Sequence, residues 1–157
     1  FDDQGAKYDE NGRLADWWTP EDVKAFDAAG KQLVTQYDQY ETFPRGKVQG
    51  ALTLGENIGD LAGLTIAYDA YKHTLGGAEA PVIDGTTGDQ RFYLGWAQVW
   101  RRNYREANLR QRLITDPHSP SEQRTWIVRN LDPWYPAFNV QAGQKMYLSP
   151  ETRVRIW

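Results

Sequence analysis

Apolar side chains recur along much of this chain at intervals of three or four residues, the spacing that puts them on one face of an α-helix. The pattern predicts helices over about residues 20–40, 52–74, 89–106 and 120–132. The first of these opens on Thr19 and Pro20, which suit an N-cap and the first helical position. We therefore expect a mainly α-helical fold with little or no β-sheet.

The length of the chain, 157 residues, is that of one ordinary domain. No internal repeat, low-complexity tract or linker interrupts it, so we expect residues 1–157 to be a piece of a single compact unit. The chain opens on Phe1 without an initiator methionine or a leader, which indicates an internal part of a longer gene product. Gly59 and Gly63, on the second predicted helix, have a spacing typical of close packing against a neighbouring helix or backbone.

Charge and composition restrict the classes of partner. Lysine and arginine number 18 against 21 for aspartate and glutamate, which argues against nucleic acid or an anionic membrane as the main partner. No apolar run approaches the roughly 20 residues that cross a bilayer, so we expect no direct membrane contact from this segment. Cysteine is absent, which excludes disulfides and thiolate metal sites. The 7 tryptophans and 9 tyrosines suit either a core or an apolar pocket, and composition leaves both uses open.

Glu56 and Asp60 form the first candidate pair. Their Glu-x-x-x-Asp spacing on the second predicted helix projects both side chains from one face. A carboxylate is an ordinary ligand for zinc, and a second carboxylate one turn away can accept the free ring N–H of a ligating histidine. Such pairs are also common on solvated helix surfaces, and the pair alone favours that simpler interpretation.

His118 is the second candidate, in a stiff loop between Pro117 and Pro120 and shortly after Asp116. A histidine held by a nearby carboxylate can stay protonated and stabilise a developing oxyanion. Arg124 follows in the first turns of the last predicted helix, where it could hold a substrate carbonyl. Taken alone, a loop histidine and a surface arginine are again the simpler interpretation.

Six segments of the chain, taken in order, resemble the neprilysin family of zinc metalloendopeptidases. They are Phe-Asp-Asp, Gly-Arg-Leu-x-Asp-Trp-Trp, Leu-Gly-Glu-Asn-Ile-x-Asp, Ala-Gln-Val-Trp, Asp-x-His-Ser-Pro-x-x-x-Arg and a final Trp, at residues 1–3, 12–18, 54–60, 97–100, 116–124 and 157. The family includes neprilysin, the endothelin-converting enzymes and bacterial oligopeptidases. The resemblance implies that residues 1–157 are the C-terminal helical part of a thermolysin-like (gluzincin) catalytic domain.

The resemblance also implies roles for the residues near the chemistry. Glu56 matches the third zinc ligand of the family, and Asp60 matches the acid that orients a ligating histidine. His118 matches the histidine that stabilises the transition state, with Asp116 as its partner. These four residues would form the part of the site that stabilises charge.

Three further residues match the family's substrate contacts. Arg124 matches the arginine that binds a backbone carbonyl of the substrate, and Val99 and Trp100 match residues that line the apolar pocket just beyond the scissile bond. The sequence departs from animal members at Gly59, where they commonly have alanine, and in its lack of cysteines. The second departure resembles bacterial members.

The family's His-Glu-x-x-His helix, which supplies two zinc ligands and the catalytic glutamate, would lie immediately before Phe1 and is absent from this sequence. The resemblance therefore implies a parent protein that is a zinc-dependent endopeptidase acting on oligopeptides, with zinc weakly bound or absent in this segment. We expect the segment alone to be inactive and to need the missing N-terminal part of the same polypeptide.

Other functions stay open from the sequence alone. One is a non-catalytic interaction or scaffold domain that keeps the peptidase fold. A carbohydrate-binding module is weaker, because such modules are mostly β and the periodicities here are helical. The resemblance implies a periplasmic or secreted parent, or one anchored to a membrane through a segment outside this chain, with a cytoplasmic location as the alternative.

Overall fold

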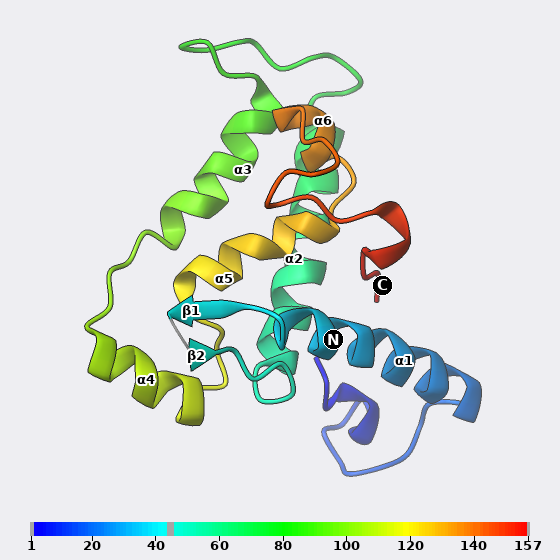
Figure 1. Ribbon diagram of the computed structural model, residues 1–157. Coiled ribbons are helices and arrows are strands. Elements are labelled where there is room, and N and C mark those ends of the chain that lie inside the picture. The colour runs from blue at the N-terminus through cyan, green and yellow to red at the C-terminus, as the bar shows by residue number, and fades with distance from the viewer. Residues whose placement is uncertain (1, 44–45, 157) are drawn as a thin grey trace. The chain divides into compact units, whose positions relative to one another are not determined.

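The computed structural model describes residues 2–43 and 46–156, and Figure 1 shows its helices and strands. Phe1 and Trp157, which carry the two ends of the resemblance, lie outside the described residues. In chain order the elements are the 3₁₀ turn Gly5–Lys7, α1 (Pro20–Tyr37), β1 (Glu41–Phe43), β2 (Gly46–Lys47), α2 (Leu54–Thr74), α3 (Gly88–Val99), α4 (Glu106–Thr115), α5 (Ser121–Thr125), the 3₁₀ turn Trp126–Asn130, α6 (Trp134–Phe138) and the 3₁₀ turn Pro150–Thr152. The prediction of a mainly α-helical fold is confirmed.

The chain folds as two compact units. The first unit comprises Phe1–Asp60, Tyr104–Pro120 and Val154–Trp157, and the second comprises Leu61–Asn103 and Ser121–Arg153. Each unit combines segments that are far apart in sequence, which is why no linker marks the division. Within the described residues, none of the helices is both long and apolar enough to cross a membrane.

In the first unit, the loop before α2 packs directly against the end of α1. Gly50 donates its backbone N–H to Asp38 Oδ1 at 2.7 Å. A Cβ at position 50 would lie 2.2 Å from the carbonyl oxygen of Val34, so only glycine fits there. Tyr37 of α1 and Ile58 of α2 are fully buried in the core. These contacts fix the point at which α2 begins, and with it the position of its first turn.

The small sheet and α4 complete the first unit. β1 pairs with β2 in an antiparallel hairpin, and α4 lies beside it (Figure 1). The Arg110 guanidinium lies 4.2 Å from the centroid of the Phe43 ring, within cation–π range. Gln49 donates its side-chain amide to the carbonyl oxygen of Leu113. α4 is thereby held at both the sheet and the loop before α2, and its C-terminal end leads into the segment that carries His118.

The second unit is organised around aromatic side chains. Tyr68 of α2 and Tyr93 of α3 stack with ring centroids 5.4 Å apart, and Phe138 of α6 lies 6.4 Å from Tyr93. Gln90 ties α3 to α6 by donating its side-chain amide to the carbonyl oxygen of Ala137 at 2.9 Å. Part of the aromatic content therefore fills a core, which is one of the two uses that composition left open.

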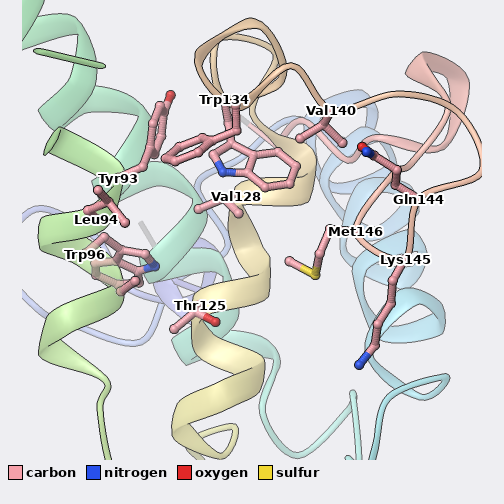
Figure 2. Close-up of a pocket in the computed structure, with 12 residues that line it drawn as sticks. Tyr93, Leu94, Trp96, Thr125, Val128, Trp134, Val140, Gln144, Lys145 and Met146 are labelled. Atoms are coloured by element: carbon pink, nitrogen blue, oxygen red, sulfur yellow. The ribbon is translucent and has the colours of Figure 1, made fainter. Parts of the chain in front are cut away.

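Other aromatic residues of this unit border a cavity. Trp96, Trp134 and Met146 border a cavity of about 530 Å³, with Val128 among its aliphatic neighbours. Figure 2 shows these side chains. The tail that closes the unit is held by Tyr135. Its hydroxyl donates to the carbonyl oxygen of residue 129 at 2.6 Å and accepts the backbone N–H of residue 148 at 3.0 Å. The aromatic content therefore serves both a core and a cavity.

The structure corrects three predictions of local structure. The third helix ends at Val99 rather than near residue 106, because Trp100 leaves the α-helical region at φ −97°, ψ 9°. Tyr104, which fitted the helical spacing, instead packs in the first unit, with the Arg112 guanidinium 5.7 Å from its ring centroid. The predicted helix over 120–132 is divided into α5 and a 3₁₀ turn.

The third correction concerns the two glycines of α2. Gly59 and Gly63 are both exposed, and among the described residues nothing beyond their chain neighbours and the backbone of α2 itself lies within 4 Å of a Cβ built on either of them. The close packing that their spacing predicts is therefore wrong for the part of the chain that the structure describes.

Tyr68 makes the second unit sensitive to alkaline pH. Burial, followed by the charge of Asp89 and a hydrogen bond to it, raises the pKa of Tyr68 from 10.0 to about 12. A raised pKa means that the stabilisation is fully present below pH 10 and is lost as the pH rises through about 12. We expect Tyr68→Phe to reduce the fall in unfolding free energy over this interval, as measured by urea unfolding at a series of pH values. The exposed Tyr8→Phe is the control, and equal pH dependence in both variants would contradict the prediction.

Candidate active site

Glu56 and Asp60 lie on α2 as the sequence predicts, but in different environments. Glu56 is in the first turn of the helix, where the helix dipole favours a negative charge, and its side chain is 43% exposed. Asp60 follows one turn later and is buried. An accessible carboxylate with a buried one behind it suits a metal ligand and the acid that orients a neighbouring ligand. Both roles stay predictions.

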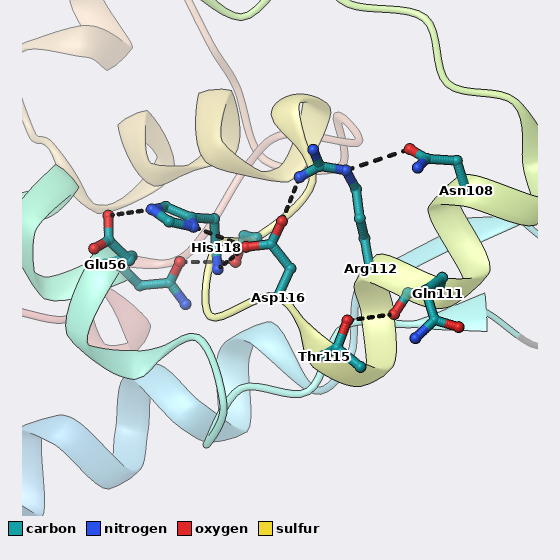
Figure 3. Close-up of polar contacts among 9 residues, drawn as sticks. Glu56, Asn108, Gln111, Arg112, Thr115, Asp116 and His118 are labelled. Atoms are coloured by element: carbon teal, nitrogen blue, oxygen red, sulfur yellow. Dashed lines mark hydrogen bonds and ion pairs between the residues drawn. The ribbon is translucent and has the colours of Figure 1, made fainter.

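His118 is held by the carboxylate that the sequence assigns to it. Asp116 Oδ1 accepts the backbone N–H of His118 at 3.0 Å and lies 2.7 Å from Nδ1 of its ring, as Figure 3 shows. This double contact fixes the loop and the ring together. It also assigns the Nδ1 proton as the one donated to Asp116, because a carboxylate can only accept.

Arg112 is a member of this group that the sequence reasoning missed. Arg112 lies in the last turn of α4, one turn before Asp116. Its guanidinium pairs with Asp116 Oδ2 (Figure 3). Burial acts to raise the pKa of Asp116, but the hydrogen bonds from His118 and the charge of Arg112 outweigh it and lower that pKa below its ordinary value. Asp116 therefore stays ionised at neutral pH. The i,i+4 spacing of an arginine and an aspartate was a usable signal once α4 was known to be a helix.

The second ring nitrogen of His118 faces Glu56. Nε2 lies 3.3 Å from Glu56 Oε2, so the imidazole is placed between two carboxylates, one on each nitrogen. When the ring is protonated, both nitrogens donate. The structure thus brings Glu56, Asp116 and His118 into direct contact within the first unit, with side chains 43%, 17% and 47% exposed and accessible to a ligand.

The predicted substrate residues belong to the second unit. Arg124 of α5 lies with its guanidinium 4.0 Å from the ring centroid of Trp100, which immediately follows α3. Val99, the residue before Trp100, is 70% exposed. A cavity of about 500 Å³ adjoins Trp100 and is bordered by Arg101 and Glu122 among others. Polar and aromatic groups therefore lie together here, as a peptide-binding surface needs, but the substrate roles stay predictions.

The donors present in the chain fit a partial metal site. Among the described residues, no group of three or more histidine, aspartate, glutamate or cysteine side chains is placed to hold a metal ion. Catalytic zinc sites use three protein ligands. Glu56 is an accessible carboxylate of the right chemistry for a zinc ligand, and that role stays a prediction.

Comparison with known proteins gives consistent matches over the chain. The family described as Peptidase family M13 matches residues 1–154. Endothelin-converting enzyme 1 of Rattus norvegicus is 39% identical over 163 residues, which cover 100% of this chain and 21% of that protein. A neutral endopeptidase of Lactococcus lactis is 34% identical over 158 residues, or 100% of this chain and 23% of that protein.

Solved structures agree with these matches. The crystal structure of the Mycobacterium tuberculosis zinc metalloprotease ZMP1 in complex with an inhibitor superposes with a TM-score of 0.95 at 52% identity, over 99% of this chain and 25% of that one. The chain thus spans about a fifth to a quarter of the length of these relatives. From the family match over nearly all its residues, this chain belongs to peptidase family M13, the neprilysin-like metallopeptidases.

Proposed function

We propose that the protein to which this chain belongs is a zinc-dependent endopeptidase that hydrolyses peptide bonds of oligopeptides. The observation that supports this function best is the placement of His118 between Asp116 and Glu56, at 2.7 and 3.3 Å from its two ring nitrogens. In this function Asp116 would keep the ring protonated, and the nearness of Glu56 would put Nε2 of His118 close to a metal ion held by Glu56.

Glu56 is the residue of this chain that would hold zinc. The ion would supply an activated water and polarise the peptide carbonyl. Asp60, buried one turn along α2, would accept the ring N–H of a ligating histidine from another part of the polypeptide. Two histidine ligands and the general base would therefore have to come from outside this chain.

His118 acts on the substrate in this proposal. Its Nε2–H donates to the carbonyl oxygen as negative charge develops there, while Asp116 holds the proton on Nδ1 and stabilises the positive ring. Arg112 keeps Asp116 ionised and in place. These groups are fixed before the substrate arrives, which is the condition under which such donors lower a barrier most.

The residues of the second unit would bind the peptide. Arg124 would donate to a substrate backbone carbonyl, and its stacking on Trp100 limits the conformations that the guanidinium can adopt. Trp100 and Val99 would contact the side chain just beyond the scissile bond. An exposed valine beside an aromatic ring suits an apolar substrate side chain.

The test compares the full-length protein with this chain alone. We expect the full-length protein to cleave an internally quenched fluorogenic peptide in a chelator-sensitive manner, restored by added zinc. The purified 157-residue chain should cleave nothing, even with zinc, because its sequence contains no His-Glu-x-x-His motif to supply the other two ligands and the general base. Hydrolysis by the isolated chain would contradict the proposed division of the site. An inactive full-length protein that retains the fold would favour the scaffold alternative.

A further inference from the structure

Buried polar side chains join the segment of Glu56 to the segment of His118. Ser119, the residue after His118, donates its hydroxyl to Asn57 Oδ1 at 2.8 Å across 62 positions of the sequence. Asn57, the residue after Glu56, donates from Nδ2 to Thr53 Oγ1 at 2.9 Å. Thr53 in turn donates its hydroxyl to the carbonyl oxygen of residue 49 at 3.1 Å. A continuous chain of hydrogen bonds therefore runs from the loop before α2 to the loop that carries His118.

This series of hydrogen bonds is shielded from water. Thr53, Asn57 and Ser119 are 3%, 1% and 3% exposed. Hydrogen bonds in a low-dielectric interior are stronger and more directional than exposed ones, and leaving a buried partner unpaired is costly. The bond between Asn57 and Ser119 therefore tolerates little displacement of α2 or of the loop that carries Ser119.

The other contacts of His118 cannot take its place. Asp116 and Arg112 belong to the same segment of chain as His118, so they orient the ring relative to that segment and not relative to α2. The Glu56–His118 contact does reach α2, but its side chains are 43% and 47% exposed. Under the proposed function, Glu56 is engaged by the metal and Nε2 of His118 by the substrate, so neither is available to the other.

We propose that the Asn57–Ser119 hydrogen bond sets the position of His118 relative to Glu56, which makes Asn57 and Ser119 positioning residues of the peptidase. This inference rests on the proposed function. Asn57 directly follows Glu56, and Ser119 directly follows His118. A displacement of either partner of the hydrogen bond therefore moves the neighbouring residue of the site. A displacement of about 1 Å in a catalytic group can lower a rate by roughly 10²-fold.

The decisive variant is the double substitution Ser119→Ala with Asn57→Leu in the full-length protein. Replacing both partners of a buried hydrogen bond by apolar groups of similar size is close to neutral for stability, whereas Ser119→Ala alone leaves Asn57 Oδ1 without this donor. Asn57→Leu also removes the bond from Asn57 to Thr53, but the Thr53 hydroxyl keeps its bond to the carbonyl oxygen of residue 49. We expect the urea midpoint to fall in the single variant and to recover in the double variant. The value of kcat for a quenched fluorogenic peptide should stay about 10- to 100-fold low in both, with KM nearly unchanged.

Two measurements do not depend on activity. The zinc dissociation constant, measured by competition with a chelator, should stay near the wild-type value, because Glu56 itself is intact. In a crystal structure of the zinc-free double variant, the separation of His118 Nε2 from Glu56 Oε2, here 3.3 Å, should lengthen or vary between copies. Tyr135→Phe is the matched control, since it removes a buried hydroxyl that makes two hydrogen bonds in the second unit. It should lose stability while kcat of the folded protein is kept.

The outcomes separate this inference from the proposed function. If the double variant recovers both stability and kcat, the hydrogen bond is only structural and the inference is overturned. If His118→Ala itself leaves kcat unchanged, the proposed function of the site fails first. If the double variant does not fold, Ser119→Thr decides: a kcat restored above that of Ser119→Ala supports a positioning hydroxyl, and equal values refute it.

Discussion

Replacing Glu56 by glutamine in the full-length protein is expected to abolish zinc retention and, with it, peptide hydrolysis. The substitution removes a negative charge from the metal's own ligand set while keeping the size of the side chain. Loss of a group that only supports a metal ligand already weakens metal binding roughly 10- to 100-fold. Loss of the ligand itself should therefore weaken zinc binding by more than about 100-fold. Metal content after dialysis and the zinc dissociation constant are the measurements.

A matched control for this prediction is Glu106→Gln. Glu106 is an exposed carboxylate in the first unit that pairs with Arg110 on the surface of α4. The control should keep both zinc and activity, because an exposed i,i+4 ion pair contributes little to stability. A Glu56→Gln protein with full zinc content would show that Glu56 is not a ligand.

His118→Ala is expected to spare zinc and to lower kcat by about 10²–10³-fold, the usual loss for a single oxyanion donor. A group that acts only in the transition state lowers kcat and kcat/KM together and leaves KM nearly unchanged. Arg124→Ala should instead raise KM, because a carbonyl of the bound substrate is available to it before reaction. Steady-state kinetics and metal content of both variants test these roles.

The other histidine supplies the control for His118. His73 lies exposed in the last turn of α2, in the second unit, and His73→Ala should leave kcat, KM and zinc content at wild-type values. If His118→Ala loses zinc while Glu56→Gln keeps it, the two roles are reversed and the assignment from family resemblance fails.

Local patterns predicted the parts of the structure that depend on local chemistry. The apolar spacing placed α1, α2 and the start of α3 within a few residues, and Thr19 is the N-cap of α1 as the sequence indicated. α4 was missed because it has no buried residue and so carries no apolar face to detect. The third helix was drawn too long because Tyr104 continued its spacing by coincidence and packs elsewhere.

The sequence predicted Glu56, Asp116 and His118 as members of the candidate site, but it missed Arg112 and the hydrogen bond that joins the His118 segment to α2. Glu56, Asp116 and His118 were identified by residue type and family resemblance, and the structure brings them together. The hydrogen bond from Ser119 to Asn57 joins residues 62 positions apart. A single sequence holds no signal for such a pair, because neither residue type nor spacing distinguishes it from any other serine and asparagine.

Gly50 limits which sequences can carry this site. Its neighbours at positions 51 and 52 are exposed, so the side chains of substituted residues there would face solvent. At position 50 any side chain would strike the backbone of α1, which cannot yield without moving the start of α2 and Glu56 with it. A redesign of the chain for higher stability or solubility can therefore vary positions 51 and 52, provided that position 50 stays glycine and Gln49 keeps its hydrogen bond to α4.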